Sequence, residues 1–145
     1  MSDVNYFLRK KNGFVISTDP AALDKDAVFE FLLEAKWWTE LTRESLELAL
    51  RHSLCFSLKG KNRRQIGVAR VITDYSTYAY LCDVFIVEEH RRRGLGSWLI
   101  RSILDHPDLK HLKRIALITH DAQTFYLRLD FRFALQPDHY MERLQ

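Results

Sequence analysis

The sequence has few of the residues that cross-link or interrupt small proteins. It contains two cysteines, three prolines and five glycines in 145 residues. These counts exclude a disulfide framework, a collagen-like repeat and a low-complexity chain. No apolar run approaches the roughly 18 to 20 residues that a membrane span needs, so we expect no membrane partner.

The two cysteines do not form a recognisable pair. Cys55 and Cys82 lie in apolar, strand-like stretches, outside any Cys-x-x-Cys or His/Cys spacing that would bind a metal. We expect reduced core residues and no metal site. Residues 1–12 mix charged and aromatic side chains without a targeting pattern. These features predict a cytoplasmic protein.

The excess of basic residues is small. There are 22 basic and 19 acidic residues, which leaves a net charge of +3, too little for a nucleic-acid-binding face. The basic residues nevertheless gather at Lys59–Arg64, Arg91–Arg93 and Lys110–Arg114, which favours a local polyanion site. The length, with 47% hydrophobic and 28% charged residues, predicts one globular domain over residues 1–145.

Strand-like and helical patterns are mixed along the chain, which predicts an α+β fold. Val28, Phe31, Leu32 and Ala35 recur at helical spacing after Asp24, a plausible cap. The predicted elements, in order, are strand 14–17, helices 24–35 and 42–52, strands 54–58, 65–73 and 78–87, helix 95–104, strand 114–119, helix 123–129, and closing strands 133–135 and 139–143.

The most informative stretch is Arg91-Arg92-Arg93-Gly94-Leu95-Gly96, which follows an apolar strand pattern and opens a helical one. Two glycines one residue apart let the backbone turn sharply and leave unpaired N–H groups where the helix dipole favours an anion. The stretch is not a P-loop, because the Gly-x-x-x-x-Gly-Lys-Ser/Thr spacing is absent. It is not the dinucleotide fingerprint either, because Leu99 stands where that motif has its third glycine. It favours a phosphate site, although such turns also occur without a ligand.

A second motif follows the next apolar strand. Asp121–Phe131 contains Tyr126, three further residues, and then Asp130 before Phe131. Together with the glycine turn, which fits Arg/Gln-x-x-Gly-x-Gly/Ala, it resembles the acyl-CoA motifs of the GNAT superfamily of N-acetyltransferases. The strongest resemblance covers about residues 78–133. Asp130 stands where this family usually has Gly, and an Asp tolerates a positive φ better than most residues.

The resemblance implies a GNAT fold, with a mixed, mostly antiparallel central sheet flanked by helices and splayed between its fourth and fifth strands, here 78–87 and 114–119. The pantetheine arm of acetyl-CoA would lie in this gap and bind unpaired strand amides as an added strand would. Backbone N–H groups of residues 93–97 are the firmest phosphate ligands, since adjacent arginines can also stay solvated. The residues expected to bind the cofactor are Phe85, Ile86, Val87, Arg91, Arg92, Arg93, Gly94, Leu95, Gly96, Ser97 and Asp121.

Two residues are candidates for catalysis. Tyr126 matches the family tyrosine that lends a hydrogen bond or a proton to the leaving thiolate; its alternative role is to pack the short helix against the sheet. Asp83 is a charge inside an apolar strand, and is either the base that takes the proton of the amine or a structural carboxylate. Another carboxylate or water could also serve as the base.

The acceptor site is predicted from chain position. In this fold the first two helices and the loop before the long strand form the acceptor pocket, which here contains Trp37, Trp38, Tyr75 and Tyr78. Aromatic rings would suit a cation or a flat amine. The tryptophans could equally cover the core.

Three functions are compatible with these features. The first, which we expect, is direct transfer of an acetyl group from acetyl-CoA to a primary amine, small-molecule or peptidyl, in a ternary complex. The second is an acyl-CoA-binding sensor or interaction module with weak catalysis. The third, nucleic-acid binding through Arg91–Arg93, lacks a recognition helix or a row of exposed aromatics. The sequence identifies no acceptor, and a homodimer is compatible with it.

Overall fold

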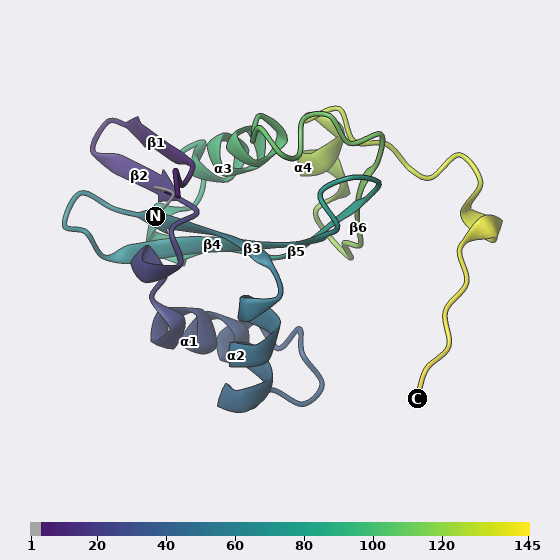
Figure 1. Ribbon diagram of the computed structural model, residues 1–145, viewed down its shortest axis with the longest axis horizontal. Helices are drawn as coiled ribbons and strands as arrows, with labels where there is room; N and C mark the ends of the chain where they lie inside the picture. Colours follow the sequence, from purple (N-terminus) through teal and green to yellow (C-terminus); the bar gives the residue numbers. More distant parts are fainter. Residues whose placement is uncertain (1–3) are drawn as a thin grey trace.

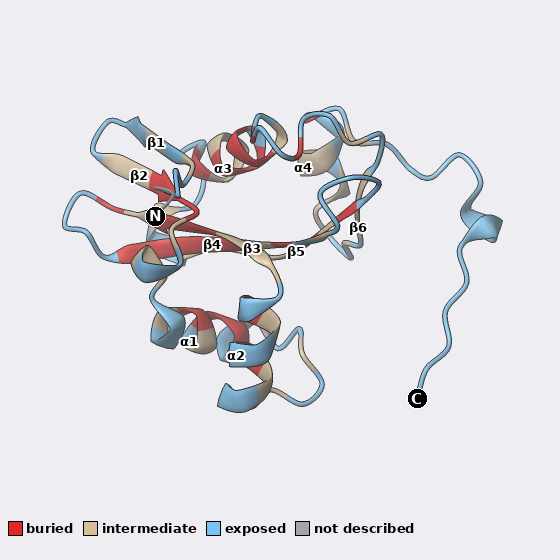
Figure 2. Ribbon diagram, in the orientation of Figure 1, coloured by how far each residue is buried: buried red, intermediate tan, exposed pale blue. Residues whose placement is uncertain are grey.

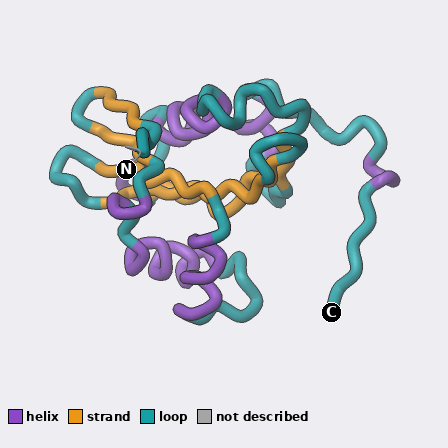
Figure 3. Tube along the Cα trace, viewed as in Figure 1, coloured by secondary structure: helices purple, strands orange, loops and turns teal. Residues whose placement is uncertain are grey.

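The computed structural model describes residues 4–145. At its centre is a six-stranded sheet whose strands lie side by side in chain order (Figures 1 and 3). Neighbouring strands are antiparallel, except that β5 and β6 are parallel, so the predicted mixed, mostly antiparallel sheet is confirmed. The strands are β1 (Leu8–Lys11), β2 (Phe14–Ser17), β3 (Leu54–Lys59), β4 (Gln65–Thr73), β5 (Ala79–Ile86) and β6 (Ile115–Leu117).

Helices cover both faces of the sheet. In Figure 1, α1 and α2 lie on one face, and α3 and α4 lie on the other. Asp24 begins α1 by accepting a hydrogen bond from the N–H of Ala27, and Thr42 begins α2 in a capping box with Ser45. The helices are α1 (Lys25–Ala35), α2 (Arg43–Arg51), α3 (Leu95–Leu104) and α4 (Gln123–Leu127), with 3₁₀ helices at Pro20–Ala22, Glu88–His90 and Pro137–His139.

Two apolar clusters, seen as buried residues in Figure 2, join the helices to the sheet. Leu99 and Ile103 of α3 pack with Val71 in one cluster. Phe31 of α1 belongs to the other, where its ring stacks on that of Phe85 with centroids 4.7 Å apart. Each such fully buried side chain stabilises the fold by about 1.5–3 kcal/mol, so these clusters fix the positions of both helical layers.

The sequence predicts no element within residues 1–12, and this is wrong. Residues Leu8–Lys11 form β1, which pairs with β2 from Leu8↔Ser17 to Lys11↔Phe14. Most of β1 is charged and exposed, which removes the alternation by which a strand is recognised. An edge strand tolerates such charges because its outer side faces water.

The closing strands predicted at 133–135 and 139–143 are also wrong. Within residues 4–145 no strand follows β6, and the chain instead runs extended, interrupted by the 3₁₀ helix Pro137–His139, away from the sheet (Figure 1). The alternating apolar residues of this segment do predict strands. A strand also needs a neighbour to pair with, however, and this segment lies away from the sheet and pairs with none of its strands.

β5 contains a bulge at Asp83. On β4, Ala69 stands opposite two β5 residues, Asp83 and Val84, and Asp83 has φ +51°. The extra residue reverses the alternation of side chains. Leu81 therefore packs in the cluster beneath α3, whereas Phe85, four residues later, packs in the cluster beneath α1 and α2.

β6 pairs only with the beginning of β5. Their register runs from Ala79↔Ile115 to Leu81↔Leu117, while β5 continues to Ile86. Beyond Leu81, the edge of β5 that faces β6 therefore has no strand partner. This is the interval in which the splay is expected; the splay itself stays a prediction.

Candidate active site

The glycine turn leads into the start of α3, where backbone N–H donors are free. Gly94 is the N-cap of α3 in the left-handed conformation, with φ +78°, and no side chain caps the helix. The helical ladder begins where the N–H of Trp98 donates to the carbonyl of Gly94. The N–H groups of Leu95, Gly96 and Ser97 consequently have no intrahelical partner. Together with the helix dipole, they form a site for an anion.

Gly94 and Gly96 have different structural roles. A Cβ on Gly94 would meet nothing within 4 Å, so this position requires glycine for its positive φ and stays open to a ligand. A Cβ on Gly96 would lie 3.4 Å from the ring of Phe125. Gly96 thus lets α4 pack closely against the start of α3, which brings the turn near Tyr126.

The three arginines of the turn differ in their surroundings. The Nε of Arg91 donates to the carbonyl of Ile86 at 2.6 Å, and its guanidinium lies 5.1 Å from the Phe85 ring. Arg91 therefore braces the turn against β5. Arg92, with φ +62°, and Arg93 are exposed beside the free N–H groups. These two can provide charge-assisted bonds to a phosphate.

At the end of β5, the structure shows which of the residues expected to contact pantetheine have free peptide groups. The side chain of Phe85 is buried in the core, and the N–H of Val87 donates to the carbonyl of Ile66 on β4. Because peptide groups alternate in direction along a strand, those of Ile86 and Val84 face the edge without a strand partner. The pantetheine contacts stay a prediction, for which the peptide groups of Ile86 and Val84 are free, while Phe85 and Val87 contribute packing.

The loop between β6 and α4 is tied by its own side chains. Thr119 Oγ1 accepts the N–H of Ala122 at 3.1 Å, and Gln123 Nε2 donates to the carbonyls of Thr119 and His120. Asp121 lies exposed on this loop. It is thus available to a cofactor that lies along the end of β6.

Tyr126 lies in a half-buried aromatic group. Its ring makes edge contacts with Phe125 and Phe131, with centroids 5.0 and 5.5 Å apart. Burial raises the pKa of its hydroxyl to about 12. After α4 the chain turns at Asp130, whose φ of +67° is the positive value that this place was expected to need. The N–H of Phe131 then donates to the carbonyl of Tyr126 at 3.1 Å.

Asp83 is the centre of a polar network beneath α1 and α2. Its Oδ2 accepts from Arg70 Nε at 2.7 Å, and its Oδ1 accepts from Trp38 Nε1 at 3.0 Å. Arg70 also donates to Ser53 Oγ and lies 5.4 Å from the Trp38 ring. The side chain of Asp83 is 7% exposed. Both of its oxygens are therefore occupied by partners that fix it in place.

The four aromatic residues expected at the acceptor site do not gather in one place. Trp37 is exposed and touches the edge of Phe85, with centroids 6.3 Å apart, while Trp38 binds Asp83. The loop between α1 and α2 thus lies over the bulge of β5. Tyr75 and Tyr78 are exposed in the loop at the opposite end of β5.

Arg70 was not predicted as a site residue. Arg70 stands in β4 between Cys55 and Cys82 on the neighbouring strands. Burial raises the pKa of the Cys55 thiol to about 12 and that of Cys82 to about 11. A single arginine in an apolar strand could have been recognised as needing a buried partner. Nothing in the sequence names Asp83 as that partner.

Two features are absent from the described part of the chain. No helix there is long and apolar enough to cross a membrane. Among residues 4–145, no group of three or more histidine, cysteine, aspartate or glutamate side chains could hold a metal ion.

Comparison with known proteins agrees with this geometry. The Acetyltransferase (GNAT) family matches residues 22–131, which include both motifs. A candidate acetyltransferase of Gibberella zeae is 34% identical over 131 residues, covering 77% of this chain and 74% of that protein.

Solved structures are similar over most of their length. A candidate GNAT-family acetyltransferase from Xanthomonas campestris pv. campestris is 38% identical, with a TM-score of 0.85 over 91% of this chain and 93% of that one. A GNAT family acetyltransferase from Elizabethkingia anophelis, with acetyl-CoA bound, has a TM-score of 0.63 at 19% identity over 93% and 90% of the two chains, a likeness of fold. With the family match over residues 22–131, these similarities show that the chain belongs to the GNAT family of acetyltransferases.

Proposed function

We propose that this protein transfers the acetyl group of acetyl-CoA to a primary amine in a ternary complex. The observation that carries the proposal is the start of α3, where Gly94 exposes unpaired N–H groups at the positive end of a helix. Arg92 and Arg93 lie exposed beside them. This arrangement suits the pyrophosphate of CoA.

The pantetheine arm would then follow the edge of β5 that β6 leaves unpaired. The peptide groups of Val84 and Ile86 face this edge, and Arg91 now occupies the carbonyl of Ile86. Binding of the arm would require Arg91 to release that carbonyl or share it. Asp121, on the loop after β6, would contact the arm from the other side.

The transfer itself needs no covalent intermediate on the protein. The amine nitrogen bonds to the thioester carbonyl carbon, the carbon–sulfur bond breaks, and its electron pair passes to sulfur. The nitrogen loses one proton to water, and the thiolate takes one proton from water. A pKa of about 12 for Tyr126, well above the roughly 8.5 of a thiol, favours a hydrogen bond to sulfur over full proton transfer.

We assign Asp83 to positioning. A base must have a free lone pair aimed at the amine, whereas both oxygens of Asp83 are directed at Arg70 and Trp38. Asp83 instead holds Trp38 over the bulge of β5, next to the exposed Trp37. The proton of the amine would pass to water. The acceptor, small-molecule or peptidyl, would bind near these two rings.

Calorimetry of CoA binding tests the phosphate site. Gly96→Val adds a side chain beside the free N–H groups and against Phe125, and should weaken binding more than tenfold, about 1.4 kcal/mol. Arg92→Ala should weaken it a few-fold. Phe125→Ala is the matched control, since it removes the ring that Gly96 touches and leaves the N–H groups free. If folded Gly96→Val binds CoA as tightly as the parent protein does, the phosphate site lies elsewhere.

A screen of amines and peptides with acetyl-CoA, which follows release of free thiol, tests turnover separately. Thiol release that depends on the amine supports the transferase. CoA binding without thiol release for any amine would instead support the second function, an acyl-CoA-binding sensor or interaction module.

A further inference from the structure

The side chain of Arg91 lies where the pantetheine arm is expected to bind. Its Nε donates to the carbonyl of Ile86 at 2.6 Å, and that carbonyl faces the edge of β5 beyond the last pair with β6. A peptide-like segment added to this edge would donate an amide N–H to the same carbonyl. In the free protein, Arg91 therefore occupies one hydrogen-bonding position of the added strand.

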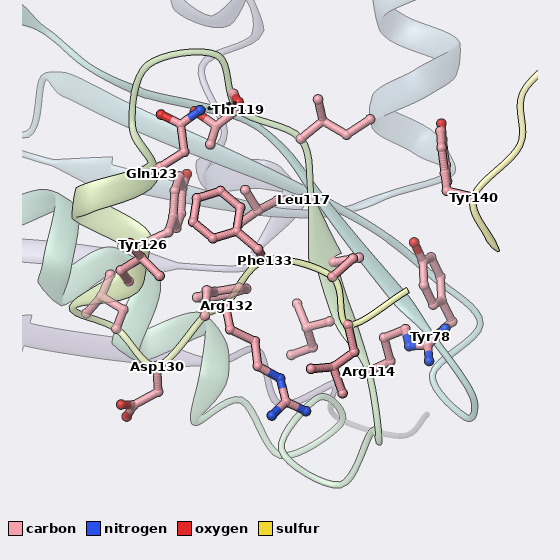
Figure 4. A pocket seen from close by; sticks show the side chains of 18 of the residues that line it. Tyr78, Arg114, Leu117, Thr119, Gln123, Tyr126, Asp130, Arg132, Phe133 and Tyr140 are labelled. Atoms are coloured by element: carbon pink, nitrogen blue, oxygen red, sulfur yellow. Dashed lines mark hydrogen bonds between the residues drawn. The ribbon is translucent and has the colours of Figure 1, made fainter. Parts of the chain in front are cut away.

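The outer edge of β6 is a less suitable place for the arm. β6 is the last strand of the sheet, and its outer edge borders the hollow between β6 and residues 131–136 (Figure 4). None of residues 79–103, all of which the structure describes, lines this hollow, so it lies apart from both β5 and the glycine turn. The edge of β5, in contrast, is joined to the glycine turn by Arg91 itself.

The guanidinium of Arg91 has no anionic partner at this edge. Among residues 4–145, no carboxylate lies within 4.0 Å of it, and its one hydrogen bond is to the carbonyl of Ile86. The ring of Phe85, with its centroid 5.1 Å away, supports the cation from one side. Most of the five N–H donors of the guanidinium therefore remain available to an anion.

A phosphate would be a better partner for Arg91 than this carbonyl. An arginine and a phosphate join opposite charges through two parallel hydrogen bonds, whereas the carbonyl is neutral and accepts one. The anion site at the start of α3 begins at Gly94, three residues after Arg91. Because the side chain of Arg91 is exposed, it is free to turn from the carbonyl toward a phosphate held there.

We propose that Arg91 couples the two halves of the CoA site and thereby selects thioesters that carry a phosphate. Without an anion, Arg91 occupies the carbonyl of Ile86 and opposes binding of the arm. With a phosphate at the start of α3, Arg91 bonds to the phosphate and leaves the carbonyl to an amide N–H of the arm. This role of Arg91 rests on the proposed function, because it concerns the same donor site.

The two positions of Arg91 define two states, and both ligands favour the same one. A phosphate binds better when Arg91 is released, because only then does Arg91 bond to it, and the arm binds better because the carbonyl of Ile86 is free. Each ligand must therefore raise the affinity for the other by the same factor, typically about 5- to 150-fold in coupled sites. A turn in which Arg91 kept one position would bind the two ligands independently.

Calorimetry with two separate fragments of acetyl-CoA tests the coupling. Acetylpantetheine supplies the arm and the thioester without a phosphate, and inorganic pyrophosphate supplies the anion. For the parent protein, we expect saturating pyrophosphate to raise the affinity for acetylpantetheine at least about fivefold, compared with sodium chloride at the same ionic strength. Equal affinities in a protein that binds whole CoA would overturn the coupling and leave the proposed function intact. A protein that does not bind CoA would contradict the proposed function, and this role of Arg91 with it.

Arg91→Ala and Arg93→Ala form a matched pair, because each removes one exposed arginine from the turn. Arg91→Ala frees the carbonyl of Ile86, so it should bind acetylpantetheine alone at least about fivefold more tightly than the parent does. Pyrophosphate should then change that affinity less than about twofold. Arg93→Ala should bind pyrophosphate more weakly and keep the coupling. Any contact between the two fragments is the same in all three proteins, so it cancels from the comparison.

The direction of the change in Arg91→Ala separates coupling from simpler roles. If Arg91 were only a phosphate ligand, its removal would leave the affinity for acetylpantetheine unchanged. If it only braced the turn against β5, its removal would lower that affinity together with the thermal midpoint. Either result would overturn the proposal, whereas tighter binding of the phosphate-free thioester with an unchanged midpoint would support it.

Discussion

Arg70 and Asp83 form an ion pair, with Nε and Oδ2 2.7 Å apart, at the point where β5 bulges. The two side chains are only 12% and 7% exposed. The pair joins β4 to β5 and, through Trp38, to the loop between α1 and α2. One buried interaction therefore connects the bulged strand to the expected acceptor side.

Replacing one member of this pair should destabilise the protein more than replacing both. Asp83→Ala leaves the Arg70 guanidinium buried without a charged partner, which costs about 3–5 kcal/mol. The double variant Asp83→Ala with Arg70→Met should lose clearly less than the sum of the two single changes. Urea unfolding of all four proteins measures this difference. Additive losses would mean that the two groups do not interact.

Asp83→Asn separates positioning from base catalysis, because an amide keeps one acceptor oxygen for Arg70 or Trp38. If Asp83 only positions Trp38, kcat should fall less than tenfold and keep its dependence on pH. If Asp83 were the base, the variant would instead lose about 10² to 10⁴ in rate, and its pH profile would lose the acidic limb.

Tyr126→Phe should lower kcat by about 10 to 10³-fold and leave CoA affinity within a few-fold, since the hydroxyl acts on sulfur in the transition state. Because the pKa of Tyr126 is raised to about 12, its loss of a proton should produce no fall in rate below pH 10. Tyr6→Phe, an exposed tyrosine, is the control. An unchanged kcat, with chemistry rate-limiting, would leave Tyr126 with its packing role.

Trp37→Ala and Trp38→Ala should differ. Trp37 is 54% exposed, so its loss should raise KM for the amine with little change in thermal midpoint. Trp38 is half-buried and bonded to Asp83, so its truncation should cost about 3 kcal/mol of stability. CoA affinity should be kept in both. A large fall in the midpoint for Trp37→Ala, with KM unchanged, would place that ring in the core.

His106 should make stability depend on pH. It is buried against Phe7 and Phe56, its Nδ1 accepts the N–H of Asp108, and burial lowers its pKa below 6.5. The unfolded chain then binds the proton first as the pH falls. The contribution of His106 is fully present above pH 6.5 and is lost as the pH falls below 6.5 and through the lower pKa of the folded state.

His106→Asn keeps an acceptor for the N–H of Asp108 but cannot titrate. Its free energy of unfolding should fall less than that of the parent when the pH drops below 6.5. His111→Asn, at an exposed position, should follow the parent. Equal losses in all three proteins would assign the pH dependence to other groups.

The sequence by itself determined the element order from residue 14 to residue 127 and the glycine turn. These features are local, because the spacing of apolar residues within one segment determines whether it forms a helix or a strand. A left-handed Gly94 at a helix start likewise follows from a strand, two glycines and a helix in succession. Tyr126 was found because its motif is contiguous.

Only the tertiary structure decided what depends on contacts between distant segments. β1 exists because it pairs with β2, and 139–144 is no strand because it runs away from the sheet and pairs with no neighbour. Because of the bulge at Asp83, the side chain of Phe85 packs on the opposite face of the sheet from that of Leu81. Arg70, thirteen residues before Asp83, binds the carboxylate that was predicted as a candidate base. Strand pairing and the burial of charge are satisfied between segments, so no local pattern specifies them.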